Sequence, residues 1–140
     1  MQFRPPRRLR RRGALLSLEL VLVLPILTTI LLAIIEFSFL LMGLQRVESA
    51  SSAACRVATL PVSDQAALDR AIRDAAAQSL GKASLVTTYQ INYNLGQYPG
   101  DPVWVQVTAP MAAAAPDLLR IVGWSLSGRQ LTAQTVMRKQ

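Results

Sequence analysis

The chain has 140 residues, enough for one membrane segment and one small domain. Its formal net charge of +7 comes from 15 basic and 8 acidic residues, and the excess is concentrated at the N-terminus. Six arginines precede Gly13, whereas nine basic residues face eight acidic ones from Ala14 onward. A folded surface that binds nucleic acid needs basic residues interleaved with aromatic ones, and the sequence has no such stretch. This charge distribution therefore argues against a nucleic-acid partner.

The residue types needed for catalysis are scarce. There is no histidine and only one cysteine, Cys55, so an intramolecular disulfide is ruled out and no metal-ligand spacing exists. We expect Cys55 to be a small helix-packing residue, with an intermolecular disulfide as the alternative. Acid–base and nucleophilic catalysis also lack their usual groups in the C-terminal part of the chain. We therefore expect no enzymatic activity, no cofactor and no bound metal.

Residues 1–13 form a basic leader, and residues 14–60 are expected to form one long helix that begins inside a membrane. The uncharged centre from Leu20 to Ile35 is about 24 Å long as a helix, and with Phe37–Leu44 it exceeds the ~30 Å hydrocarbon thickness. We expect the helix to run from about Leu15 to about Ala58, with the first dozen residues outside it.

The arginines predict the orientation of this helix. Six precede the span, against Arg46 and Arg56 just after it, which favours a cytoplasmic N-terminus and a periplasmic C-terminal domain in the bacterial inner membrane. A cleaved secretory signal with a cut near Ser49–Ser51 is the alternative, but its apolar core should be only 7–15 residues long.

Two carboxylates and a proline interrupt the apolar helix. Glu19 and Glu36 are 17 residues apart, or about 26 Å, so each could extend to the opposite interface. That arrangement accounts for Glu36 but less well for Glu19, which follows small and apolar residues. Pro25 removes one backbone hydrogen bond and is expected to kink or loosen the helix.

This order of basic leader, glycine, glutamate, apolar helix and proline resembles the cleavage signal of type IV pilin-like proteins. More narrowly, residues 10–60 resemble the TadE-like minor pseudopilins of tight-adherence (Flp) pilus systems. The likeness is carried by the Glu19-to-Pro25 spacing, by the run Ile34-Ile35-Glu36-Phe37 and by the small-residue tract ending near Leu60.

The resemblance implies processing and assembly. A prepilin peptidase would remove the leader at Gly13 or Ala14, and Glu19 would then pair with the new α-amino group of a neighbouring subunit. Glu19 is the sixth residue after a cut at Gly13 and the fifth, as is usual in pilins, after a cut at Ala14. We favour Gly13. The implied partners are the peptidase, other pilin or pseudopilin subunits and the inner-membrane assembly platform.

The helix continues beyond the membrane with a face of small residues from Ala50 to Ala58. Such a face lets another helix approach closely, and it could equally pack on the chain's own domain. Both interpretations stay open from the sequence.

Residues 61–140 are expected to form a small domain of one helix and about three antiparallel strands. Ser63 is the expected N-cap of the helix and Gly81 its C-terminal stop. A strand is expected from Leu85 to Leu95, where apolar and polar residues alternate.

The rest of this domain follows from turn and strand patterns. Tyr98–Asp101 has the proline and glycine of a type II turn, and Val103, Val105 and Val107 predict the next strand. A last strand is expected over Arg129–Lys139. The segment Asp117–Trp124 either covers the core or presents Trp124 as a docking or membrane-surface patch.

The sequence therefore predicts an α+β fold with a pilin-like membrane helix. The expected function is that of a processed pseudopilin-like subunit, with roles in pilus assembly and adhesion. Two alternatives stay open: an uncleaved bitopic envelope protein whose outer domain binds a partner, and a secreted domain released near Ser51.

Overall fold

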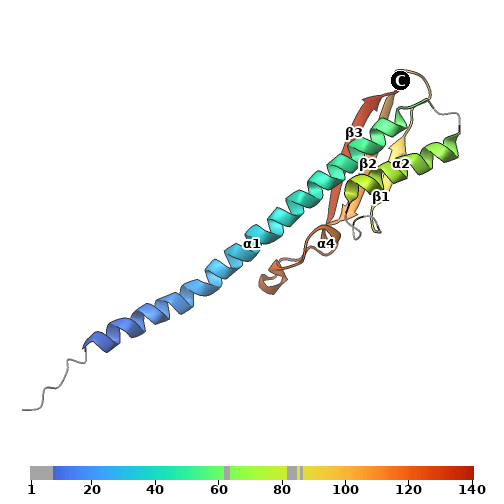
Figure 1. Ribbon diagram of the computed structural model, residues 1–140. Coiled ribbons are helices and arrows are strands. Elements are labelled where there is room, and N and C mark those ends of the chain that lie inside the picture. The colour runs from blue at the N-terminus through green and yellow to red at the C-terminus, as the bar shows by residue number, and fades with distance from the viewer. Residues whose placement is uncertain (1–7, 62–63, 82–84, 86) are drawn as a thin grey trace, which may run out of the picture.

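A computed structural model describes residues 8–61, 64–81, 85 and 87–140, with side chains described from residue 19 onward. Helix α1 extends over Arg8–Ala58, and its N-terminal half projects away from a small domain that packs on its C-terminal half (Figure 1). Helix is present from Arg8, so the expected start near Leu15 is wrong. Arginine and leucine are good helix formers, and a single glycine does not end a helix. Residues 1–7 of the leader lie outside the described residues.

Pro25 lies inside α1, and the helix is continuous through it. Two hydroxyls bond to backbone carbonyls in the adjoining turns: Thr28 Oγ1 donates to the Leu24 carbonyl and Thr29 Oγ1 to the Pro25 carbonyl, both at 2.8 Å. A proline is tolerated in an apolar helix when nearby hydroxyl groups bond to the carbonyl groups of the helix backbone. Whether α1 bends at Pro25 stays a prediction.

The domain has a three-stranded antiparallel sheet in the order β1-β2-β3, with bounds β1 Gln90–Asn94, β2 Pro102–Pro110 and β3 Gln130–Arg138. The last two strands confirm the sequence prediction. The first is shorter than the predicted strand over Leu85–Leu95. The backbone N–H groups of Thr88 and Tyr89 both donate to the carbonyl of Leu85, which closes a turn where the strand was expected to begin. Val86 lies outside the described residues.

Helix α2, Gln65–Leu80, lies beside α1 and packs over β1 (Figure 1). Its N-cap is Asp64, whose side chain accepts a hydrogen bond from the N–H of Ala66, so the prediction of Ser63 is wrong by one position. Aspartate and serine serve equally well as N-caps, and sequence alone does not separate adjacent candidates. Ser63 itself lies outside the described residues. Gly81 ends the helix at φ +61°, as predicted.

The core lies between the two helices and one face of the sheet. Val103, Val105 and Val107 are fully buried on β2 and alternate with half-exposed residues on the opposite face. The small-residue face of α1 packs directly on this sheet: the buried members are Ala50, Ser51, Ala54, Cys55 and Ala58. Small side chains let the α1 backbone approach the strands closely. The interpretation in which this face packs on the chain's own domain is therefore confirmed.

Two short helices follow β2. α4, Met111–Ala114, packs against α1, and the 3₁₀ helix η1, Leu119–Val122, contacts α1 further toward its N-terminus. The segment that carries η1, brown in Figure 1, extends from the end of the sheet toward the projecting half of α1. The domain therefore contacts α1 further toward its N-terminus than the sheet does.

Candidate functional site

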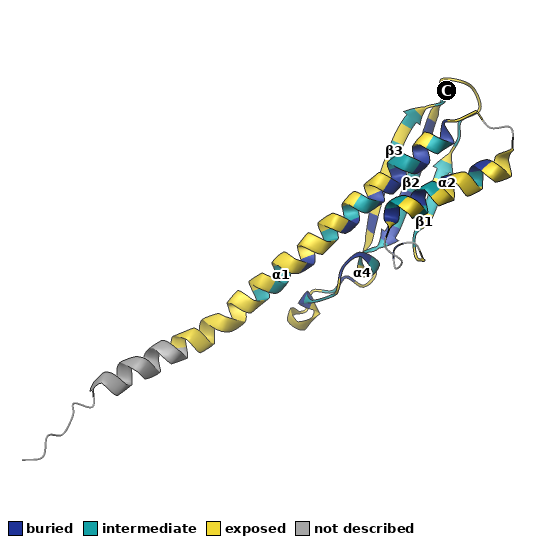
Figure 2. Cartoon of the chain, in the orientation of Figure 1, coloured by how far each residue is buried: buried dark blue, intermediate teal, exposed yellow. Residues whose placement is uncertain are grey.

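The projecting half of α1 is an apolar surface that the domain leaves uncovered. From residue 19 onward Figure 2 shows it as an almost unbroken exposed helix, and Leu20, Val21 and Leu22 are each more than 60% exposed. The described part of α1 that is long and apolar enough to cross a membrane is Glu19–Ala58, 40 residues. The core helix of a soluble protein would bury its apolar side chains, whereas these lie open. This surface suits lipid or other apolar helices.

Glu19 lies at the start of that surface and its side chain is exposed. Among the described side chains no hydrogen bond or ion pair reaches its carboxylate. A carboxylate in lipid costs roughly 2.5–3.5 kcal/mol near the bilayer centre, so a cationic partner would stabilise it. The backbone of Gly13 and Ala14 is helical, and their surroundings lie outside the described part.

Glu36 is fully buried against the outer domain, so the prediction that its side chain extends outward into water is wrong. Its Oε2 accepts a hydrogen bond from the backbone N–H of Leu119 at 2.8 Å. Helices leave their first N–H groups without intrahelical partners, and Glu36 satisfies one of these groups at the start of η1. Oε1 is also buried and has no hydrogen-bond partner among the described residues. Glu36 is therefore a tertiary contact between the membrane helix and the outer domain.

Residues 115–129, called here the outer loop, are tied together by their own polar groups. Asp117 accepts hydrogen bonds from Ser125 Oγ at 3.0 Å and from the N–H of Leu126 at 3.3 Å. Gly123 ends η1 at φ +88°, and Leu126 is buried. The Arg129 guanidinium lies 3.8 Å from the ring centroid of Trp124. The outer loop therefore has a defined structure, which is stabilised by the burial of Leu126 and by the hydrogen bond between Leu119 and Glu36.

Gly43 is a contact residue that sequence reasoning missed. A Cβ placed on it would lie 2.6 Å from the Cβ of Ala114 and 3.3 Å from Cδ1 of Leu131. Only glycine lets α4 and β3 approach α1 so closely at this level. A lone glycine in a long apolar helix is the signal that could have pointed to it.

Ser51 and Cys55 attach α1 to the sheet. Ser51 Oγ lies 2.8 Å from the carbonyl of Val105 and 2.9 Å from Thr135 Oγ1. Cys55 is a free thiol and is fully buried between α1 and the sheet. A buried thiol is not accessible to a second chain, which supports a packing role over an intermolecular disulfide.

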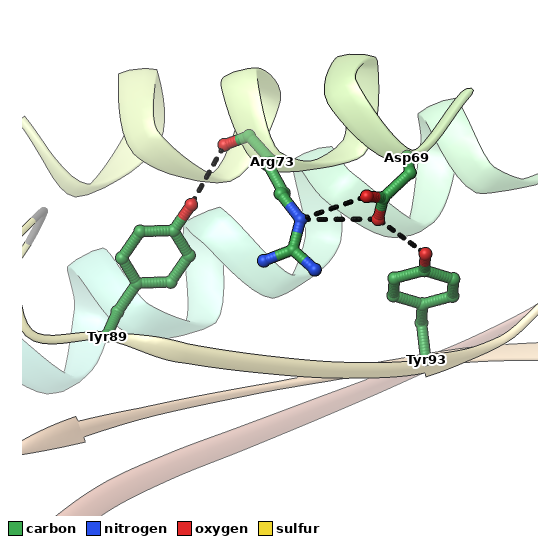
Figure 3. Close-up of polar contacts among 4 residues, drawn as sticks. All are labelled: Asp69, Arg73, Tyr89 and Tyr93. Atoms are coloured by element: carbon green, nitrogen blue, oxygen red, sulfur yellow. Dashed lines mark hydrogen bonds and ion pairs between the residues drawn. The ribbon is translucent and has the colours of Figure 1, made fainter. Parts of the chain in front are cut away.

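A polar cluster joins α2 to β1 at the surface (Figure 3). Tyr93 donates from its hydroxyl to Asp69, whose carboxylate also pairs with Arg73 Nε at 3.2 Å, and Tyr89 donates to the carbonyl of Arg73. The bond from Tyr93 and the pairing with Arg73 lower the pKa of Asp69. The same bond to Asp69 raises the pKa of Tyr93. The cluster helps to fix α2 on β1.

Within the described ranges, no three cysteine, aspartate or glutamate side chains come together as a metal site would require. What the arrangement provides is a long exposed apolar helix, an exposed acidic residue near its start with no partner among the described side chains, and a small domain fixed to its other half. The fold and these features define a single-pass membrane protein with an N-terminal membrane helix.

The match to a known protein family covers the membrane helix. Residues 16–56 match the family model described as TadE-like protein, which confirms the TadE-like resemblance over that segment. The match indicates a membrane protein associated with tight-adherence pili. No curated protein and no solved structure matches the chain.

Proposed function

We propose that this protein is a minor pilin- or pseudopilin-like subunit that a prepilin peptidase processes before it assembles with other subunits. In this role it is not an enzyme. Its N-terminus lies in the cytoplasm and its α+β domain in the periplasm, and α1 holds it in the inner membrane until it joins an assembling pilus.

The observation that carries this proposal is Glu19, an exposed carboxylate at the start of an exposed apolar helix. In a single-pass anchor that stays alone in lipid, such a residue is only a cost. In an assembling subunit, the α-amino group released by cleavage after Gly13 or Ala14 would supply the cation that relieves it. The TadE-like match over residues 16–56 supports the same role.

The helical backbone on both sides of Gly13 bears on the processing step. We expect the first turns of α1 to unwind locally when the peptidase cuts, because the cut lies inside a helix. Glycine costs about 1 kcal/mol relative to alanine inside a helix, which makes Gly13 the easiest place in this region to open.

The alternative is an uncleaved bitopic protein whose outer domain binds an envelope partner. Its specific support is the close attachment of that domain to α1 through Ser51 and Glu36. Such an attachment would hold the outer domain in a fixed orientation on a single membrane helix. The two functions differ in the N-terminus of the mature protein.

Intact-mass measurement of the chain extracted from its native membrane separates them. Processing predicts loss of residues 1–13 or 1–14, and Gly13→Val should block that loss. Retention of the leader in the wild-type mature protein would overturn the proposal. Once cleavage is shown, Glu19→Ala should abolish co-assembly without changing folding, whereas Glu19→Asp should retain part of it.

A further inference from the structure

The outer loop carries an exposed apolar tip. Ile121 is 86% exposed, Val122 56% and Trp124 39%, although the segment on either side is fixed by Leu119 and Leu126, which are buried. Three exposed large apolar side chains within four residues of a loop that is fixed on both sides indicate a surface that contacts an apolar partner.

The position of this tip along α1 identifies the contact. Glu36 binds the N–H of Leu119, at the start of η1, so the loop lies at the level of Glu36. Glu36 follows Arg12 by 24 residues, which is about 36 Å along a helix. The hydrocarbon core is ~30 Å thick, so with Arg12 at one headgroup layer Glu36 lies in the opposite one.

The chemistry of the tip fits that layer. Tryptophan is enriched where hydrocarbon meets headgroups, and arginine can extend its guanidinium from there to lipid phosphates. Arg120 is exposed beside Ile121, and Arg129 stacks on Trp124. Phe37 and Phe39, which follow Glu36 closely on α1, are also exposed apolar side chains.

We propose that the outer loop is a second membrane contact, in which Ile121, Val122 and Trp124 insert into the near leaflet of the bilayer that α1 crosses. Arg120 and Arg129 bind the phosphates of that leaflet, and Glu36 holds the loop at the required depth. The domain is thereby seated against the lipid surface and does not swing freely on α1. This inference needs the membrane crossing by α1 and is independent of any assignment to a pilus.

Depth-dependent quenching of tryptophan fluorescence tests the proposal with the full chain in vesicles of phosphatidylcholine and phosphatidylglycerol. The chain has two tryptophans, so Trp104→Phe leaves Trp124 as the reporter and Trp124→Phe leaves Trp104 on the sheet. Lipids brominated near the headgroup should quench Trp124 about twofold more strongly than Trp104, because only Trp124 lies in the leaflet. If Trp104→Phe fails to fold, the difference in quenching between the wild type and Trp124→Phe gives the quenching of Trp124.

The result distinguishes lipid from a second copy of the chain as the partner that covers Ile121, Val122 and Trp124. Equal quenching of the two tryptophans would overturn the proposal. So would quenching of Trp124 that disappears as the protein-to-lipid ratio rises, because protein–protein contact would then cover the tip. In the Trp104→Phe background, Ile121→Asp should reduce the quenching of Trp124, and Ser127→Asp, on an exposed position of the same loop, should not.

Discussion

Glu36 on the membrane helix and Leu119 on the outer loop are joined by a hydrogen bond of 2.8 Å between residues 83 positions apart. The bond lies at the point where α1 leaves the bilayer in the arrangement proposed above. It fixes the outer loop to α1 at a level that the sheet does not reach. The carboxyl group is therefore a connector between the anchor and the domain, and its buried setting makes this role testable.

Replacing Glu36 with leucine should release the outer loop while leaving the sheet folded. The buried N–H of Leu119 would lose its acceptor, a change that costs about 1–3 kcal/mol. Glu36→Gln keeps an acceptor of the same length and serves as the matched control. Amide hydrogen exchange of the full chain in detergent should show faster exchange at Leu119 in Glu36→Leu only. Equal protection in both variants would mean that the bond does not hold the loop.

Gly43→Ala should destabilise the packing of α4 and β3 on α1. Alanine favours a helix over glycine by about 1 kcal/mol, but its Cβ would lie 2.6 Å from that of Ala114, and overpacking costs about 1–3 kcal/mol. The double variant Gly43→Ala, Ala114→Gly removes the clash and should recover stability. Urea unfolding of the wild type, of Gly43→Ala and Ala114→Gly alone, and of the double variant measures the coupling. A single variant as stable as the wild type would show that α4 shifts aside at no cost.

Ser51→Val should weaken the attachment of α1 to the sheet by about 1–3 kcal/mol, since the hydroxyl of Thr135 loses a buried partner and a larger side chain meets the strands. Ser52→Val, at the adjacent half-buried position, is the control and should have a much smaller effect. Thermal unfolding followed by circular dichroism separates the two. If both substitutions lower the midpoint equally, helix propensity and not the contact with the sheet explains the loss.

The sequence was sufficient for features that depend on local patterns. Alternation of valines predicted β2, the proline and glycine of residues 98–101 predicted a turn that closes with a bond from the N–H of Asp101 to the carbonyl of Tyr98, and Gly81 predicted the end of α2. These features depend on period-two burial and on backbone conformations that glycine favours.

Tertiary contacts explain what sequence reasoning missed. Glu36 was expected to extend into water because its partner is a backbone N–H 83 positions along the chain, and a sequence pattern does not show which backbone N–H groups need an acceptor. The predicted strand from Leu85 was too long because Leu85 is drawn into the core, where it is fully buried, and the chain turns after it. The small residues of α1 suited either a second helix or the sheet, and only the packing distinguishes them.

The cluster of Asp69, Arg73 and Tyr93 predicts how stability depends on pH. The pKa of Asp69 is lowered by the bond from Tyr93 and by Arg73, so its contribution is present above the unfolded-state pKa of about 3.9 and is lost as the pH falls through the lower folded-state value. The pKa of Tyr93 is raised, so its contribution is present below about 10 and is lost as the pH rises through the folded-state value.

Asp69→Asn should therefore flatten part of the acid limb in urea-unfolding curves of the detergent-solubilised chain between pH 6 and about 3, because asparagine does not titrate in the window that the aspartate pKa defines. Asp101 also has a lowered pKa, owing to bonds from the N–H groups of Tyr98 and Gln97, so some acid sensitivity should remain in the variant. Tyr93→Phe removes the first of the two interactions on Asp69 and should give an intermediate curve. Because Asp69 lies on an exposed surface where solvent screens its charge, the effect should be modest. An Asp69→Asn chain whose acid limb coincides with that of the wild type would assign the acid loss to other carboxylates.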